Sequence, residues 1–185
     1  KYNIIMNKIL VLLASHNGEK FIKKQIDSIF NQKSCIIDLI VSDDCSTDST
    51  LVVLNKLKKQ YKKLKIIVNK KKFRNFSENF YHLILSSDAS NYDFIAFSDQ
   101  DDIFKNNKFK LQINEINNKN FSASSCAVKC FQASNRLLYQ SPKINKYDFL
   151  FEGAGQGCTF IIKKNLFVGL QKFIRENFSK INNFI

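Results

Sequence analysis

Short apolar runs alternate with amphipathic stretches through residues 8–116, and this alternation constrains the fold more than any other feature. Continuous apolar runs, typical of strands buried on both faces, lie at 8–15, 36–42, 64–68 and 93–98. Helical patterns cover 16–32, 46–57, 75–87 and 108–116. Strands that alternate with helices of this length predict right-handed βαβ units and a mostly parallel sheet flanked by helices.

Three details of this pattern can be checked against a structure. Ser46 or Thr47 is placed to cap the second helix. The predicted inner positions are Phe21, Ile22, Ile26, Ile29 and Phe30 in the first helix, and Phe76, Phe80, Leu83 and Ile84 in the third. The later part is less regular: it predicts a strand at 122–131, an antiparallel partner at 135–140, and a strand that turns into a helix over 157–174. We therefore expect a smaller mixed or antiparallel part in the second half.

The size and composition predict one globular domain over residues 1–185. With 44% hydrophobic residues, 5 glycines and 1 proline, the chain can bury a core and offers no flexible linker. No apolar run approaches the ~20 residues of a membrane span, and the first residues lack a leader pattern. The 5 cysteines form no CxxC pair. Reduced thiols and a cytoplasmic location are the expectation.

The formal net charge of +13 is concentrated between Lys56 and Arg74. Such a field attracts polyanions, whether nucleic acid, anionic lipid or a phosphorylated substrate. A solvated lysine-rich helix face explains the same pattern. The segment has no helix-turn-helix signature and few interleaved aromatic residues, which argues against nucleic acid.

Polar motifs follow three of the predicted strands directly. They are "SHNG" (15–18), "SDDCSTDS" (42–49) and "SDQDD" (98–102). Ligands of parallel sheets bind at the carboxyl ends of the strands, so these motifs are predicted to gather along one rim.

The motif "SDQDD" places Asp99, Asp101 and Asp102 just past an apolar strand. Carboxylates this close repel one another, and a hard divalent ion such as Mg²⁺ or Mn²⁺ relieves that repulsion. A solvated turn is the alternative for any acidic triplet. On an α/β rim with a second acidic turn, the set suits a metal-bound nucleotide diphosphate, whose departure the ion assists as a Lewis acid.

Two other nucleotide-binding patterns are excluded. The sequence "GAGQG" (153–157) is neither preceded by a buried strand nor followed by a clear helix, as a dinucleotide fingerprint requires. There is also no P-loop lysine motif.

The chain resembles the glycosyltransferases of family 2, which have the GT-A (Rossmann-like) fold, and most of all their bacterial rhamnosyltransferase-like branch. The resemblance rests on "LLASHNGEKFIKKQIDSIFNQ", "VSDDCSTDST", "FSDQDDIF" with its DxD motif, and "FEGAGQGCTFIIKKNLF", in that order. It implies transfer of a sugar, rhamnose being favoured, from a UDP- or dTDP-sugar to a glycan or lipid-linked acceptor with inversion. It also implies a role in bacterial cell-surface polysaccharide biosynthesis.

The resemblance assigns roles to individual residues. Ser15 and His16 would lie against the nucleobase. Asp44 would hydrogen-bond the base, and Asp43 would lie beside Asp44. Asp99 would contact the ribose or sugar and help hold Mg²⁺ or Mn²⁺, for which Asp101 would be the main ligand. Asp102 would order the loop or meet the sugar. Asn79 matches a position that approaches the nucleotide.

The chain departs from the family pattern at two places. Asn75 stands where relatives usually have glycine, which Asn can replace in a left-handed turn. The family's acidic base motif is not found before Ile185, and Asp148 and Glu152 lack its context, so no catalytic base is assigned. We expect a nucleotide-binding half at 1–120 and the start of an acceptor half, apparently truncated, at 121–185.

Two alternatives remain open. One is a nucleotidyltransferase on the same kind of sheet. The other is a non-catalytic module that binds nucleotide or nucleic acid. Under the main hypothesis the segment between Lys56 and Arg74 makes a peripheral contact with the inner face of the membrane, at ~1 kcal/mol per well-placed basic residue.

Overall fold

The computed structural model describes residues 6–129, 137–139 and 156–182. Its main sheet contains β1 (Asn7–Ser15), β2 (Cys35–Asp43), β3 (Leu64–Val68), β4 (Phe94–Ser98), β5 (Ala123–Ser124) and β8 (Ile161–Lys163). The helices are α1 (Ile22–Phe30), α2 (Thr50–Gln60), α3 (Phe76–Ser86), α4 (Lys108–Asn118) and α6 (Lys164–Asn182). A 3₁₀ turn, η1 (Gly157–Thr159), precedes β8, and β6 (Val128–Lys129) pairs with β7 (Leu137–Tyr139) in a separate antiparallel ribbon.

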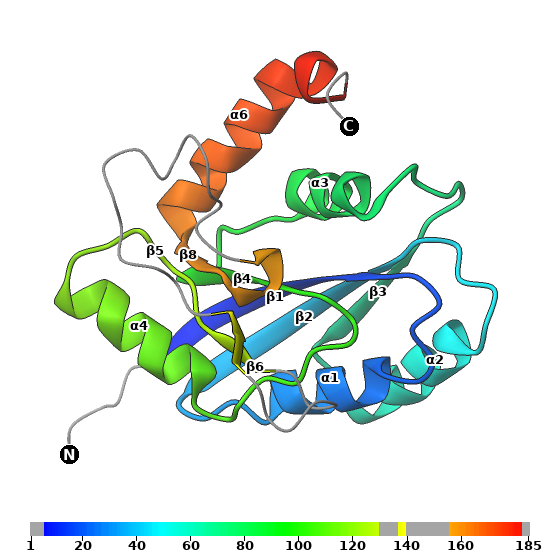
Figure 1. Cartoon of the computed structure of the whole chain (residues 1–185), viewed down its shortest axis with the longest axis horizontal. Coiled ribbons are helices and arrows are strands. Elements are labelled where there is room, and N and C mark those ends of the chain that lie inside the picture. Colours follow the sequence, from blue (N-terminus) through cyan, green and yellow to red (C-terminus); the bar gives the residue numbers. More distant parts are fainter. Residues whose placement is uncertain (1–5, 130–136, 140–155, 183–185) are drawn as a thin grey trace.

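The strand order of the main sheet is β3-β2-β1-β4-β8-β5. β1, β2, β3 and β4 are parallel, and β8 is antiparallel to both β4 and β5. Figure 1 shows α3 and α6 on one face of this sheet and α1 and α2 on the other. The predicted mostly parallel sheet with flanking helices is confirmed, and the antiparallel pairs of β8 come from the second half of the chain.

The alternation of side chains along β1 explains the two layers. Ile9, Val11 and Leu13 pack on one face against α1, α2 and α4, while Leu10 and Leu12 pack on the other against α3 and α6. Because both faces are covered, β1 has no polar residue between Lys8 and Ser15. The hydrophobic core thus fixes the strand, and Ser15 is the polar side chain at its carboxyl end.

The helices differ from the sequence prediction in two boundaries and in the exposure of two side chains. α1 begins only at Ile22, because residues 16–21 form a loop in which Asn17 has a φ of 51°. Neither Ser46 nor Thr47 caps α2, which begins at Thr50. Two expected core side chains also point outward, since Phe21 is 45% exposed and Phe76 is 74% exposed.

The second half confirms part of its prediction. The expected strand at 122–131 is two short pieces, β5 and β6, and the expected antiparallel partner is β7. The predicted strand-to-helix segment at 157–174 is η1, β8 and α6. Asp148, Glu152 and most of "GAGQG" lie outside the described residues.

Candidate nucleotide and metal site

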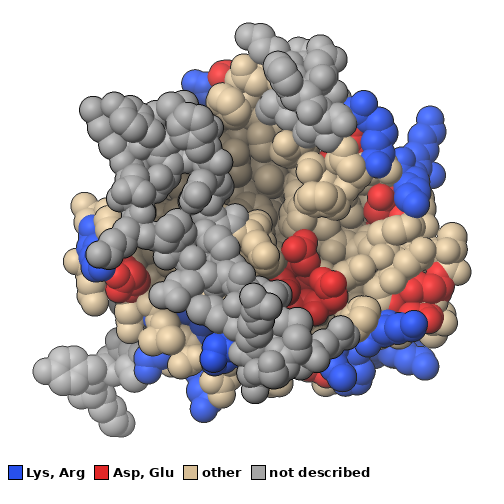
Figure 2. All heavy atoms as spheres, viewed as in Figure 1, with Lys and Arg blue, Asp and Glu red and all other residues tan. Residues whose placement is uncertain are grey.

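Three loops meet at the carboxyl ends of the parallel strands, as the sequence predicts. Ser15 pairs in register with Asp43, and the backbone N–H of Asp44 donates to the Ser15 carbonyl over 2.8 Å. A cavity of about 280 Å³ opens at this edge. Its lining includes Ser15, His16, Asp44, Asn79, Asp99 and Asp101 among the predicted residues, together with Lys72, Phe73, Arg74 and Gln100. Figure 2 shows acidic atoms beside a hollow on this face of the molecule.

Asp43 and Asp44 are adjacent in sequence, but only Asp44 lines the cavity. The Asp43 side chain is fully buried and accepts hydrogen bonds from the backbone N–H and the hydroxyl of Ser46, so it shapes the turn and does not line the cavity. Asp44 lines the cavity, and its Oδ1 accepts the N–H of Phe73 over 2.8 Å. Asp44 is therefore the carboxylate of this turn that a ligand can reach.

Asn79 lines the cavity and has an unsatisfied hydrogen-bond acceptor. Its Nδ2 donates to the Ser42 carbonyl over 3.1 Å, which fixes the amide, while the buried Oδ1 has no hydrogen-bond partner among the described residues. An unpaired buried acceptor costs stability unless a ligand or water donates to it. Asn79 thus offers a fixed hydrogen-bond acceptor next to Asp44.

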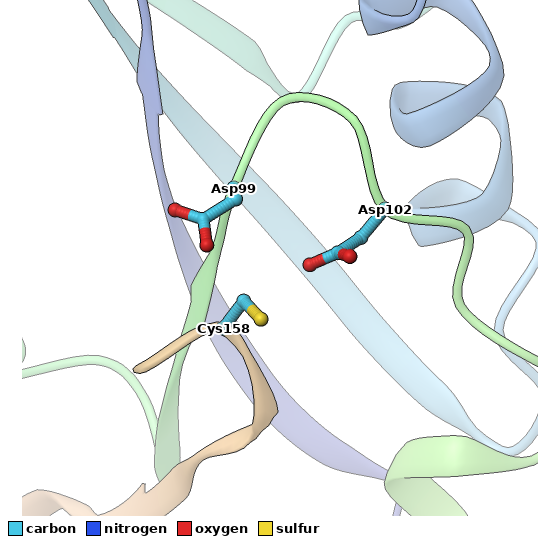
Figure 3. Close-up of side chains that lie close together, drawn as sticks. All are labelled: Asp99, Asp102 and Cys158. Carbon is cyan, nitrogen blue, oxygen red and sulfur yellow. The ribbon is translucent and has the colours of Figure 1, made fainter. Parts of the chain in front are cut away.

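The acidic triplet divides into two parts. Asp99 and Asp102 lie with Cys158 so that ligand atoms of all three are within 4.8 Å of one another. Figure 3 shows the two carboxylates at the two ends of the loop after β4, with the Cys158 side chain beside them. Asp101 is exposed, lines the cavity and is not part of this group. Sequence reasoning missed Cys158 because it is distant along the chain, on η1.

Burial and mutual repulsion set the electrostatics of this group. Burial raises the pKa of Asp99, and the charge of Asp102 raises it further. Burial also raises the pKa of Asp102, against a hydrogen bond from the Cys158 thiol. Burial and the hydrogen bonds to these carboxylates hold the pKa of Cys158 well above its usual range, so its thiol stays protonated. The available metal ligands are therefore carboxylate oxygens, which suit Mg²⁺ or Mn²⁺.

Lys108 brings a buried positive charge close to the acidic group. Its ammonium lies 4.0 Å from the centre of the Phe104 ring and 5.0 Å from that of Phe109, and it has no hydrogen-bond partner within the described ranges. Burial lowers its pKa to about 8, and the negative charge of Asp102 opposes this shift. The sequence shows a lysine at the start of a helix, where exposure is the ordinary expectation.

Together, the parallel sheet, the cavity at its carboxyl edge and the acidic group define an α/β nucleotide-binding domain with a candidate site for a divalent ion. The family model for glycosyl transferase family 2 matches residues 10–178. The chain belongs to that family.

Two relatives of similar sequence agree with this membership. The chain is 38% identical over 168 residues to the dTDP-rhamnosyl transferase RfbG of Shigella flexneri, covering 89% of this chain and 58% of that protein. It is 25% identical over 159 residues to the UDP-Glc:alpha-D-GlcNAc-diphosphoundecaprenol beta-1,3-glucosyltransferase WfaP of Escherichia coli, covering 85% of this chain and 61% of that protein. It thus spans roughly six tenths of each relative.

The fold of this chain is also similar to that of a solved structure with low sequence identity. The mannosyltransferase PcManGT of Pyrobaculum calidifontis, solved with GDP-Man and Mn²⁺, aligns with a TM-score of 0.66 at 14% identity. The alignment covers 89% of this chain and 47% of that one. The fold is therefore the GT-A fold of glycosyltransferases.

Proposed function

We propose that this chain binds a nucleotide-sugar donor, with a dTDP- or UDP-sugar as the class and rhamnose as the first sugar to test. It would transfer the sugar, with inversion, to a glycan or lipid-linked acceptor. The observation that carries the proposal is one cavity that combines Asp44 and Asn79 with Asp99 and Asp101. The first pair provides hydrogen-bond acceptors for a base or ribose, and the second pair is placed to engage a cation-bound diphosphate.

Each residue has a distinct task in this proposal. Asp44 and Asn79 accept hydrogen bonds from the nucleoside, and the ring of His16 packs against the base. Asp99 and Asp101 would hold Mg²⁺ or Mn²⁺, while Asp102 keeps the loop in place through the Asp99 and Cys158 group. When bound, the ion withdraws charge from the departing diphosphate. No described residue is assigned as the base that activates the acceptor.

The names of the relatives support the substrate classes. RfbG is a dTDP-rhamnosyl transferase, and WfaP uses UDP-Glc with a diphosphoundecaprenol acceptor. The chain spans 58% and 61% of these relatives. We propose that residues 121–185 belong to an acceptor-binding half.

The membrane hypothesis concerns the basic segment. Lys56, Lys58 and Lys59 are exposed on α2, and no helix of the described residues is long and apolar enough to cross a bilayer. We propose that this segment contacts anionic lipid headgroups from one side of the membrane. Failure to co-sediment with anionic vesicles at low salt would count against that contact.

The proposal is tested by calorimetric titration of the chain with UDP and dTDP, with and without Mn²⁺. Binding that requires the metal and is lost in Asp101→Ala supports a metal–diphosphate site. Asp93→Ala, at a carboxylate outside the cavity, controls for general loss of negative charge. If neither nucleotide binds the unaltered chain, the proposal is wrong for this chain.

The two alternatives are separated by a second experiment. Release of the nucleoside diphosphate on addition of a glycan acceptor indicates sugar transfer and excludes nucleotidyl transfer. A salt-sensitive shift with random duplex DNA that UDP does not change indicates a nucleic-acid-binding module.

A further inference from the structure

Two basic side chains line the cavity, and they differ in how they are paired. Arg74 is bound by Glu78, whose carboxylate accepts from the guanidinium and from the Arg74 backbone N–H. Lys72 has no carboxylate within ion-pair distance in the described part of the chain. Its ammonium lies instead 3.1 Å from Nε2 of His16. The cavity therefore contains a positive charge that no carboxylate of the described residues neutralises.

The hydrogen bonds of His16 explain why Lys72 is held there. Nδ1 of His16 lies 2.7 Å from the backbone carbonyl of Asp44, which can only accept, so Nδ1 carries the hydrogen. The Lys72 ammonium can only donate, so Nε2 is the acceptor in the contact between the two side chains. An ammonium has three donors, and this contact uses one of them.

The remaining donors of the Lys72 ammonium lie at a cavity that several carboxylates also line. Asp44, Asp99 and Asp101 all line it, and a diphosphate that enters brings further negative charge. A divalent ion at Asp99 and Asp101 compensates only part of that charge. A second cation that is already positioned lowers the cost of bringing the phosphates in, and hydrogen bonds from a charged donor to phosphate are among the strong ones.

We propose that Lys72, held at the cavity by His16, is the residue that binds the phosphates of the nucleotide. This inference deepens the proposed function and rests on it. It also separates Lys72 from its neighbours in the basic segment, because neither Lys70 nor Lys71 lines the cavity. Lys72 then acts in ligand binding, whatever the rest of the segment contacts.

The test is a ligand series that varies only in phosphate number. Uridine, UMP and UDP are titrated, in Mn²⁺ at fixed ionic strength, against the unaltered chain, Lys72→Met and Lys71→Met. Methionine keeps the apolar stem and removes the charge, and Lys71 is the adjacent exposed lysine outside the cavity. We expect Lys72→Met to weaken UDP binding by roughly tenfold and uridine binding by less than about twofold, with Lys71→Met unchanged.

A double-mutant cycle tests the tether itself. His16→Phe retains an aromatic ring but removes the Nε2 acceptor, so its effect on UDP binding should depend on whether Lys72 is present. We expect the effects of His16→Phe and Lys72→Met on UDP binding to be non-additive, and their effects on uridine binding to be additive. Additive effects on UDP binding would show that Lys72 acts without His16, and the proposed role of His16 in holding Lys72 would then be wrong.

The outcomes separate this inference from the function on which it rests. If the unaltered chain binds none of the three ligands, the proposed function fails. If it binds UDP but Lys72→Met matches it for all three, or loses uridine as much as UDP, only the role of Lys72 is wrong.

Discussion

The side-chain amide of Gln100 spans both backbone groups of His16. Oε1 of Gln100 accepts the His16 N–H over 2.9 Å, and Nε2 donates to the His16 carbonyl over 2.9 Å. The same Oε1 accepts from the Ser15 hydroxyl over 3.0 Å. The loop after β4 is thus fastened to the loop after β1, so the acidic residues on one side of the cavity are held against the residues on the other.

This bridge gives the first prediction. Gln100→Ala removes all three hydrogen bonds and should reduce the free energy of unfolding by roughly 1–3 kcal/mol. UDP and dTDP binding should weaken as well, because the two sides of the cavity are no longer fixed. Chemical denaturation and calorimetry measure the two effects. Gln156→Ala, outside the cavity and exposed, is the control; unchanged nucleotide affinity in Gln100→Ala would contradict the prediction.

Gly18 is predicted to be intolerant of a side chain. A Cβ built there would lie 2.3 Å from Oε1 and 2.8 Å from Cδ of Gln100, and Gln100 cannot move away without losing its bonds to Ser15 and His16. Gly18→Ala should therefore weaken nucleotide binding about as much as Gln100→Ala does. The double variant should be no worse than either alone, because removing the Gln100 side chain also removes the clash.

A glycine in open space provides the matched control. Gly169 lies in α6, and outside its own stretch of that helix no heavy atom of the described residues lies within 4 Å of the position that a Cβ would take there. Gly169→Ala should therefore stabilise the protein by up to ~1 kcal/mol. It should leave nucleotide affinity unchanged. A loss of binding in Gly169→Ala equal to that in Gly18→Ala would mean that the effect is not local to the cavity.

The group of Asp99, Asp102 and Cys158 should lower the stability of the metal-free protein and support metal binding. Because the pKa of Asp102 is raised above 3.8 in the folded protein, its ionisation destabilises the fold, and this penalty develops as the pH rises from about 4 through the folded pKa. Asp102→Asn should therefore raise the thermal midpoint of the metal-free protein at neutral pH. It should also weaken Mn²⁺ binding by roughly tenfold or more.

Thermal unfolding in EDTA and in Mn²⁺, from about pH 4 to about pH 8, checks both parts. The stability difference between Asp102→Asn and the unaltered chain should shrink toward the acid end, where the Asp102 carboxyl is increasingly protonated in both the folded and the unfolded protein. A variant that is less stable than the unaltered chain in EDTA at neutral pH would count against the repulsion argument.

Lys108 should have the opposite pH signature. Its pKa is lowered from 10.5 to about 8 in the folded protein, so the buried ammonium destabilises the fold fully below about pH 8, and this cost disappears as the pH rises toward 10.5. Lys108→Met should increase the free energy of unfolding at neutral pH by roughly 1–3 kcal/mol, with the cation–π contacts to Phe104 and Phe109 offsetting part of the gain.

Denaturant titrations at pH 7 and pH 10 measure this difference. Lys110→Met, at an exposed lysine on the same helix, should change stability little at either pH. A Lys108→Met protein that is destabilised at neutral pH would show that the ammonium has a strong partner.

Local patterns in the sequence determined the elements of the sheet and the identity of most of the candidate site. The continuous apolar character of β1 required cover on both faces, and a parallel sheet then placed Ser15, Asp44 and Asp99 at one edge. The gathering of Ser15, Asp44 and Asp99 was predictable because it depends on periodicity and strand direction, which are local properties. Asn79 was assigned to the same set by the family resemblance alone, and it also lines the cavity.

Only the tertiary structure decided which side chains meet. It brought Cys158 to Asp99 and Asp102, turned Phe76 outward, buried the ammonium of Lys108, and set Lys72 against His16. Each of these depends on the packing of segments far apart in the chain, and no local period encodes that. The sequence by itself thus established the sheet and the rim that carries the carboxylates, whereas long-range packing established their partners, because charge and hydrogen-bond energies depend on distances that only the folded chain defines.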